Sequence, residues 1–182
     1  MARQIDIDLD QLDLAFENSS FETFYFLDLE TGFLEVVTQE ARQLLDEVND
    51  RVFDVAGKER VPFEQAVNEL DTEDGLKDEV MEARQIMSAV GSRYLQVPRE
   101  DVHEGFHDMT EYVETVQDQR LKDALLFALR GARPFRQFKD VLATSRIESD
   151  RWEDFKKARR RGRALKWLRD QGIEPIVDGA PL

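Results

Sequence analysis

The first forty residues contain short apolar runs separated by turn-forming residues. Two runs rich in β-branched and aromatic residues, 22–29 and 33–38, flank the turn Glu-Thr-Gly. Gly32 can supply the positive φ that a tight turn requires. The pattern therefore predicts an antiparallel hairpin over residues 22–38, and the apolar run at 93–97, ended by a proline, predicts a third strand beside it.

Elsewhere in the first half, apolar residues recur every three or four positions, which is the spacing of a helix with one buried face. A short helix capped by Asp8 precedes the hairpin. After it, the spacing predicts a helix capped by Thr38 and closed by Gly57, a short helix over 62–70 and another over about 76–90.

The second half of the chain reads as helical throughout. Two D-x-x-E patterns, Asp108 with Glu111 and Asp150 with Glu153, have the form of capping boxes. The first box predicts a helix that starts at Asp108, and the second predicts a long helix that ends near Asp170. The final segment, IEPIV, is either an edge strand or a tail.

Together these elements predict an α+β protein, predominantly helical, with a small antiparallel sheet made of the hairpin 22–38 and the strand 93–97. The chain has 182 residues, of which 41% are hydrophobic and twelve are Phe, so it can fill one well-formed core. We therefore expect a single domain over residues 1–182.

Composition excludes several classes of protein. There is no cysteine, which rules out disulfides, thiolate zinc sites and a thiol nucleophile. The N-terminus MARQIDIDLD lacks the apolar core of a signal peptide, and no run of about 18 apolar residues occurs. We expect a bacterial-type cytoplasmic protein that does not enter a membrane.

Charge is distributed unevenly along the chain, whose formal net charge is −14. Residues 1–120 hold 10 basic and 30 acidic side chains, whereas residues 121–182 hold 15 basic and 9 acidic ones. The balances are −20 and +6. We expect the cationic last third to meet carboxylates, either of this chain or of a neighbour.

The stretch from His103 to His107 spells H-E-x-x-H, a zinc-binding pattern of metalloproteases with Glu104 as the general base. The capping box at Asp108 places both histidines in the loop before the helix. If the helix instead reached back to residue 101, both would point away from its apolar stripe, which would consist of Val102, Phe106, Met109, Val113 and Val116.

These are the only two histidines, so a third ligand would have to be one of 39 acidic side chains, and none is specific. We therefore predict no metal site and no catalytic residue, and a zinc hydrolase using His103, Glu104 and His107 stays an alternative, as does adventitious metal binding by the histidines. The patterns G-x-x-x-x-G-K, G-x-G-x-x-G and G-x-S-x-G are absent from the sequence, so we expect no cofactor.

The strongest candidate for binding is the basic segment DRWEDFKKARRRGRALKWLRD. On a helical wheel its cations gather on one side, flanked by two tryptophans. The candidate binding residues are Arg133, Arg136 and Lys139, beside the face formed by Trp152, Lys156, Arg159, Arg160, Arg163 and Lys166. This face could form salt bridges with an acidic surface, neutralise phosphates while the tryptophans stack on bases, or be merely solvated.

Three blocks resemble a bacterial family, the uncharacterised protein family 0158. They are DLDQL…FYFLDLETGFLEVV, RYLQVP…FHDMTEYVETVQDQRLKDALLFALRGARPFRQFKDVL and DRWEDFKKARRRGRALKWLRDQGIEP. Residues 39–90 match poorly, and we treat them as a variable helical region within the domain. The resemblance implies no activity and no cofactor.

These observations favour a non-enzymatic cytoplasmic binding or regulatory protein that acts through protein–protein contacts or self-association. The alternative is a nucleic-acid-binding protein that uses the basic helix 150–170.

Overall fold

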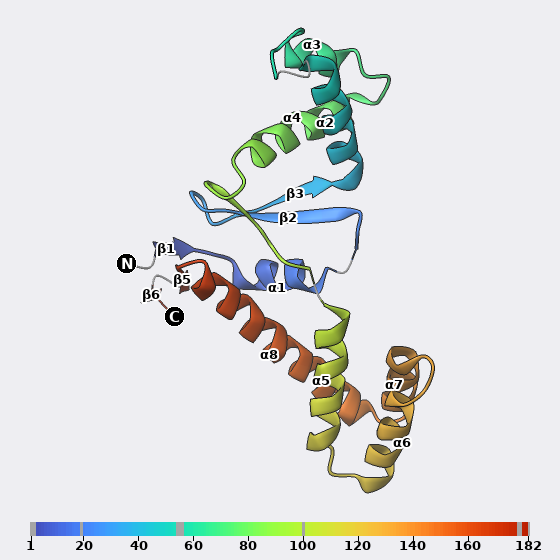
Figure 1. Ribbon diagram of the computed structural model, residues 1–182. Coiled ribbons are helices and arrows are strands. Elements are labelled where there is room, and N and C mark those ends of the chain that lie inside the picture. Colours follow the sequence, from blue (N-terminus) through green and yellow to red (C-terminus); the bar gives the residue numbers. More distant parts are fainter. Residues whose placement is uncertain (1–2, 19, 54–56, 100, 178–179, 182) are drawn as a thin grey trace. The chain divides into compact units, whose positions relative to one another are not determined.

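A computed structural model describes residues 3–18, 20–53, 57–99, 101–177 and 180–181 (Figure 1). These residues form helices α1–α8 and strands β1–β6, and they confirm the α+β class. They divide into two compact units. The mixed unit contains residues 1–98 and 173–182, and the helical unit contains residues 99–172. The single domain over 1–182 stays a prediction.

The mixed unit contains the predicted antiparallel sheet. Strand β2 (Thr23–Asp28) lies in the centre and pairs antiparallel with β3 (Leu34–Thr38) and with β4 (Tyr94–Gln96). The hairpin and the third strand are thus both confirmed. Local sequence was sufficient here because a tight turn fixes the register of a hairpin.

Gly32 closes the hairpin with a φ of 76°, the conformation that the turn pattern predicts. A second constraint comes from the strand that precedes the hairpin in the chain. A Cβ atom at this position would clash with the carbonyl oxygen of Asp6. Both the backbone angle and the close approach of Asp6 therefore require glycine.

The helices of the mixed unit follow the predicted caps. Thr38 accepts a hydrogen bond from the Ala41 amide at 3.1 Å and begins α2, and Asp8 caps α1 in the same way. Helix α2 ends at Val52, earlier than predicted, since Phe53 is extended; residues 54–56 lie outside the described part. The bounds are α1 Leu9–Glu17, α2 Gln39–Val52, α3 Phe63–Asn68 and α4 Asp74–Ser88.

The core of the mixed unit lies between the sheet and helices α2, α3 and α4. Phe26 of β2 and Val37 of β3 are buried there against Leu45, Val48 and further apolar side chains of the three helices.

A second, smaller sheet joins the two ends of the chain. In it, β1 (Arg3–Asp6) pairs in parallel with β5 (Ile173–Val177), so IEPIV is a strand, and β6 (Ala180–Pro181) pairs with β5.

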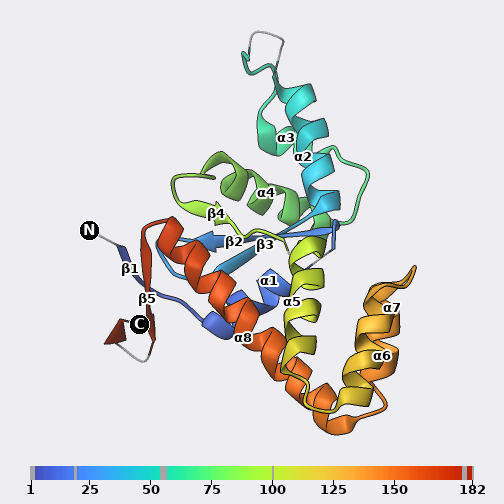
Figure 2. The ribbon, with the colours of Figure 1, turned by 60° about the horizontal axis from the view of Figure 1, so that its bottom comes forward.

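The helical unit consists of four helices, of which α6 and α7 form an antiparallel hairpin (Figure 2). Their bounds are α5 Val102–Thr115, α6 Gln119–Leu129, α7 Pro134–Leu142 and α8 Arg146–Asp170. The last of these ends at the predicted residue. No helix in the described part of the chain is long and apolar enough to cross a membrane.

Both predicted capping boxes are wrong. Helix α5 begins six residues before Asp108, and its cap is Asp101, which accepts a hydrogen bond from the His103 amide at 2.8 Å. Helix α8 begins at Arg146 and is capped by Ser145. Acidic residues three apart are frequent in a chain with 39 of them, so this pattern alone does not locate a helix start.

The core of the helical unit is aromatic. The Tyr112 ring of α5 meets the rings of Phe138, Trp152 and Phe155 edge to face, with centroids 6.4, 5.0 and 5.4 Å away. The Tyr112 hydroxyl donates to Glu148 Oε2 at 2.8 Å. Helices α5, α7 and α8 are therefore held around one buried side chain.

Candidate functional site

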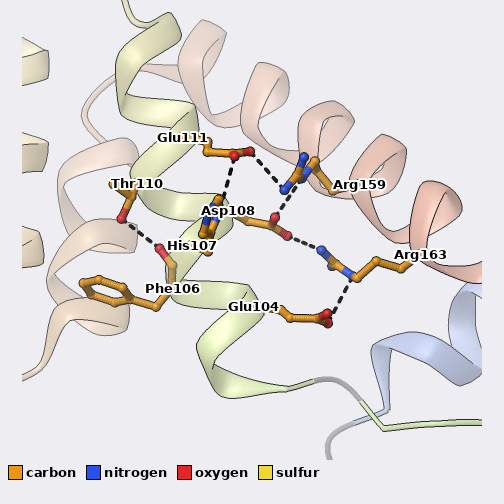
Figure 3. Close-up of polar contacts among 8 residues, drawn as sticks. All are labelled: Glu104, Phe106, His107, Asp108, Thr110, Glu111, Arg159 and Arg163. Carbon is orange, nitrogen blue, oxygen red and sulfur yellow. Dashed lines mark hydrogen bonds and ion pairs between the residues drawn. The ribbon is translucent and has the colours of Figure 1, made fainter. Parts of the chain in front are cut away.

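Asp108 joins α5 to α8 through two arginines of the long helix (Figure 3). Its Oδ1 lies 2.8 Å from Arg159 Nε, and its Oδ2 lies 2.7 Å from Arg163 Nη1. Asp108 is only 3% exposed. A buried carboxylate is stable only when it is paired, and the two arginines, four residues apart on one side of α8, supply that pairing.

Two further carboxylates of α5 extend this network at its solvent edge. Glu111 Oε2 lies 3.0 Å from Arg159 Nη2, and Glu104 Oε2 lies 3.5 Å from Arg163 Nε. The hydrogen bond to Asp108 is the main cause that raises the pKa of Arg159 above its ordinary value. The prediction that cations of the last third pair with carboxylates of this chain is therefore confirmed for Arg159 and Arg163.

The other candidate residues of α8 are also not presented as one open cationic face. Lys156 lies 2.7 Å from Glu153, and Lys166 lies 2.7 Å from Asp170, each a neighbour on the same helix. Arg160 is half-buried. The expectation that Trp152 flanks this face is corrected: its side chain is 6% exposed and belongs to the aromatic core.

The H-E-x-x-H residues lie on a helix and not in the predicted loop. His103 and His107 are both exposed, as expected for a helix that reaches back to residue 101. The expected apolar stripe is buried only from Met109 onward, because Val102 and Phe106 are also exposed. Both histidines line a groove of about 610 Å³ between α5 and α8.

One set of side chains on α5, two of which line this groove, has the spacing of metal ligands. Atoms of His107, Asp108 and Glu111 lie within 4.8 Å of one another. A divalent cation there would face the guanidinium of Arg159, which lies 2.8 Å from Asp108 and 3.0 Å from Glu111. Like charges at such distances repel strongly when partly buried. The geometry therefore fits an ion-pair network better than a metal site, and Glu104, the general base of the pattern, is held by Arg163.

The cations of the α6–α7 hairpin differ from those of α8. Four of them follow one another at three-residue spacing in RGARPFRQFK and are exposed; we name Arg130, Arg133, Arg136 and Lys139 the cationic row. Within the described residues, Arg130, Arg133 and Lys139 form no ion pair, and Arg136 reaches only Asp140, at 3.9 Å. The sequence reasoning missed Arg130, although the three-residue spacing would have indicated it.

Two phenylalanines adjoin the cationic row. The rings of Phe106 on α5 and Phe135 on α7 meet edge to face with centroids 6.5 Å apart, and they remain 38% and 40% exposed. A Cβ atom on Gly105 would lie 3.4 Å from the Phe135 ring, so the glycine leaves room for this contact. We name Phe106 and Phe135 the phenylalanine pair. Lys139 is one turn from Phe135, so apolar and cationic side chains share one surface.

These features define an α+β protein with a mixed unit and a helical unit that carries exposed cations beside exposed aromatic rings. Residues 61–180 match the family model of an uncharacterised protein family, UPF0158. The chain belongs to this family, as the sequence resemblance predicts; the second and third sequence blocks lie within the matched residues, and the first precedes them. No curated protein and no solved structure matches it.

Proposed function

We propose that the chain is a non-enzymatic cytoplasmic binding protein that acts through protein–protein contacts, with the cationic row as its contact surface. One observation carries the proposal: among the described residues, the row's cations have no acidic partner closer than the 3.9 Å contact of Arg136 with Asp140, whereas Arg159 and Arg163 of α8 are paired with α5. An exposed cluster of unpaired like charges raises the potential around it and attracts an oppositely charged surface.

The phenylalanine pair supports a protein partner for the row. Exposed ion pairs contribute only about 0–1 kcal/mol each, so charge alone gives little affinity. Aromatic and arginine side chains are enriched at the centres of protein interfaces, where they contribute most of the binding energy. Phe106, Phe135 and the adjacent arginines offer this combination on one surface.

The nucleic-acid alternative has lost much of its support. It relied on the basic helix and on tryptophans that stack on bases. Trp152 is buried, and Arg159 and Arg163 are bound to carboxylates. The exposed cations of the row could still meet phosphates, and the same experiment separates the two cases.

The proposal is tested by capture from a native lysate of the source organism, at low and high salt, with and without nuclease. The row variant Arg133→Gln/Arg136→Gln/Lys139→Gln is compared with wild type. The control Lys156→Gln/Lys157→Gln/Lys166→Gln removes the same charge from α8.

We expect wild type and the α8 control to retain the same protein with nuclease present, and the row variant to lose it. Capture of that protein by the row variant would contradict the proposal. Loss of all binding on nuclease treatment would favour nucleic acid instead.

A further inference from the structure

We infer that the cationic row binds a second copy of this chain, at the acidic surface of its α3–α4 segment. The inference rests on the proposed function and names the partner. Charge complementarity between two exposed surfaces of the chain supports it.

The acidic surface covers residues 61–82, which contain eight acidic side chains and one basic one, Lys77. All eight are exposed: Glu64, Glu69, Asp71, Glu73, Asp74, Asp78, Glu79 and Glu82. The Lys77 ammonium donates to the Asn68 carbonyl at 3.2 Å, and the one acidic side chain in the described residues with which it pairs is Asp74, at 3.8 Å. This segment is the most concentrated negative charge that the described helices present, and a single lysine leaves it uncompensated.

The acidic surface and the cationic row also have similar lengths. On α4, Asp74, Asp78 and Glu82 follow at four-residue spacing, so they lie on one side of the helix over about 12 Å. On α7, the row from Arg133 to Lys139 extends over about 9 Å. Two lines of opposite charge with comparable length can form several ion pairs at once.

Apolar side chains accompany the charges on both surfaces. Met81 is half-buried between the acidic positions of α4 and lines, with Val67 and Asp78, a groove of about 200 Å³. The phenylalanine pair, which adjoins the row, offers the matching apolar area. Burial of such area supplies the affinity that exposed ion pairs lack.

The charges of the two units fit a reciprocal arrangement. The helical unit holds 17 basic and 14 acidic side chains, a balance of +3, and the mixed unit holds 8 basic and 25 acidic ones, a balance of −17. Each copy therefore brings one surface of each sign. In a two-fold symmetric dimer the contact between row and acidic surface forms twice, and the assembly is closed.

The test is a charge-reversal exchange followed by sedimentation velocity over a concentration series. One variant reverses the row (Arg133→Glu/Arg136→Glu/Lys139→Glu). The other reverses the acidic surface (Asp71→Lys/Asp78→Lys/Glu82→Lys), and it avoids Asp74 and Glu79, which bind Lys77 and Thr38. Circular dichroism checks that each variant is folded.

We expect wild type to dimerise, and high salt to weaken the dimer. Each variant alone should lose affinity for itself by about 30-fold or more, which corresponds to six exposed ion pairs, three in each of the two symmetric contacts. An equimolar mixture of the two variants should form a heterodimer again, because both contacts regain opposite charges.

A wild-type chain that stays monomeric over the whole concentration series would overturn the inference without any variant. So would self-association that survives either reversal, or a mixture of folded variants that does not associate. If the row still captures another protein from lysate while the chain is monomeric, only this inference fails. If capture is also independent of the row, the proposed function fails with it.

Discussion

Asp108 and Arg163 are 55 residues apart in the chain, yet their Oδ2 and Nη1 atoms lie 2.7 Å apart in the helical unit. Arg159 Nε donates to the other oxygen, so each oxygen of the Asp108 carboxylate accepts a hydrogen bond from one guanidinium group. Two arginines of the basic segment in α8 therefore form ion pairs that hold α8 to α5. The exposed cations that we propose for a partner lie on the α6–α7 hairpin, in the cationic row.

Removal of the Asp108 charge should destabilise the helical unit. In Asp108→Asn, two arginines keep their charge but lose a buried partner, and we expect the free energy of unfolding to fall by about 2–3 kcal/mol. This is less than for a fully buried pair because Arg159 remains partly exposed. Urea unfolding measures the change.

Asp140→Asn is the control for Asp108→Asn, since the 3.9 Å contact of Asp140 with Arg136 is exposed and should contribute under about 0.5 kcal/mol. Equal effects of the two substitutions would refute the structural role of Asp108.

Tyr112→Phe should cost about 1.5 kcal/mol of unfolding free energy, since it deletes the hydrogen bonds to Glu148 inside the aromatic core. Burial, followed by the bond to Glu148, raises the pKa of the Tyr112 phenol above its ordinary value of about 10. As the pH rises, the Tyr112 phenol therefore ionises in the unfolded chain before it ionises in the folded one. Its contribution to the free energy of unfolding is present below pH 10 and declines as the pH rises further. Chemical denaturation of wild type and variant from pH 7 to 11 should show their difference shrinking. Tyr25→Phe is the control. If the difference between wild type and Tyr112→Phe stays constant over this pH range, the stabilising role of the hydrogen bond to Glu148 is contradicted.

Asp28 should make the free energy of unfolding depend on pH under acidic conditions. The hydrogen bond from Arg93, with Nη2 to Oδ2 at 2.7 Å, is the main cause that lowers the pKa of Asp28. Its contribution to stability is then present above the ordinary carboxyl pKa of about 4 and is lost as the pH falls through the lowered folded-state value. Asp28→Asn should remove this component, so that the acid unfolding curves of variant and wild type converge below pH 4. Parallel curves would contradict the pairing.

Zinc should not bind stoichiometrically. After purification in chelator and addition of zinc, elemental analysis of the desalted protein should find well below one equivalent, unchanged in His103→Ala, because Arg159 and Arg163 already hold the carboxylates beside the histidines. Arg159→Ala frees Glu111 and part of Asp108, so it should bind zinc more tightly than wild type. One equivalent of zinc in wild type, lost in His103→Ala, would restore the hydrolase alternative.

Local signals in the sequence predicted much of the fold. The hairpin around Gly32 and the cap at Thr38 depend on residues that are neighbours in the chain, and both are present. The capping boxes failed because D-x-x-E describes both a helix start and two acidic side chains within a helix. Asp108 lies within α5, where it pairs with Arg159, 51 residues away, and Asp101 caps the helix instead.

The candidate site was predictable only in part. The helical wheel grouped Trp152 with the cations of α8, yet a wheel gives no direction for the core, and the tryptophan faces inward. The sequence did show the spacing of the cationic row. That its members lack close acidic partners depends on tertiary contacts, which no spacing reveals.

The most direct test of the cationic row as a contact surface is the rate of lysine acetylation, measured by mass spectrometry on the dilute monomer and on the complex with its protein partner, whether a second copy or another protein. Lys139 of the row is compared with Lys157 and Lys166 of α8, and all three are exposed. We predict that Lys139 is acetylated several-fold more slowly in the complex, while the two α8 lysines keep their rates. An unchanged rate at Lys139, or protection of Lys157 and Lys166 in its place, would contradict the account.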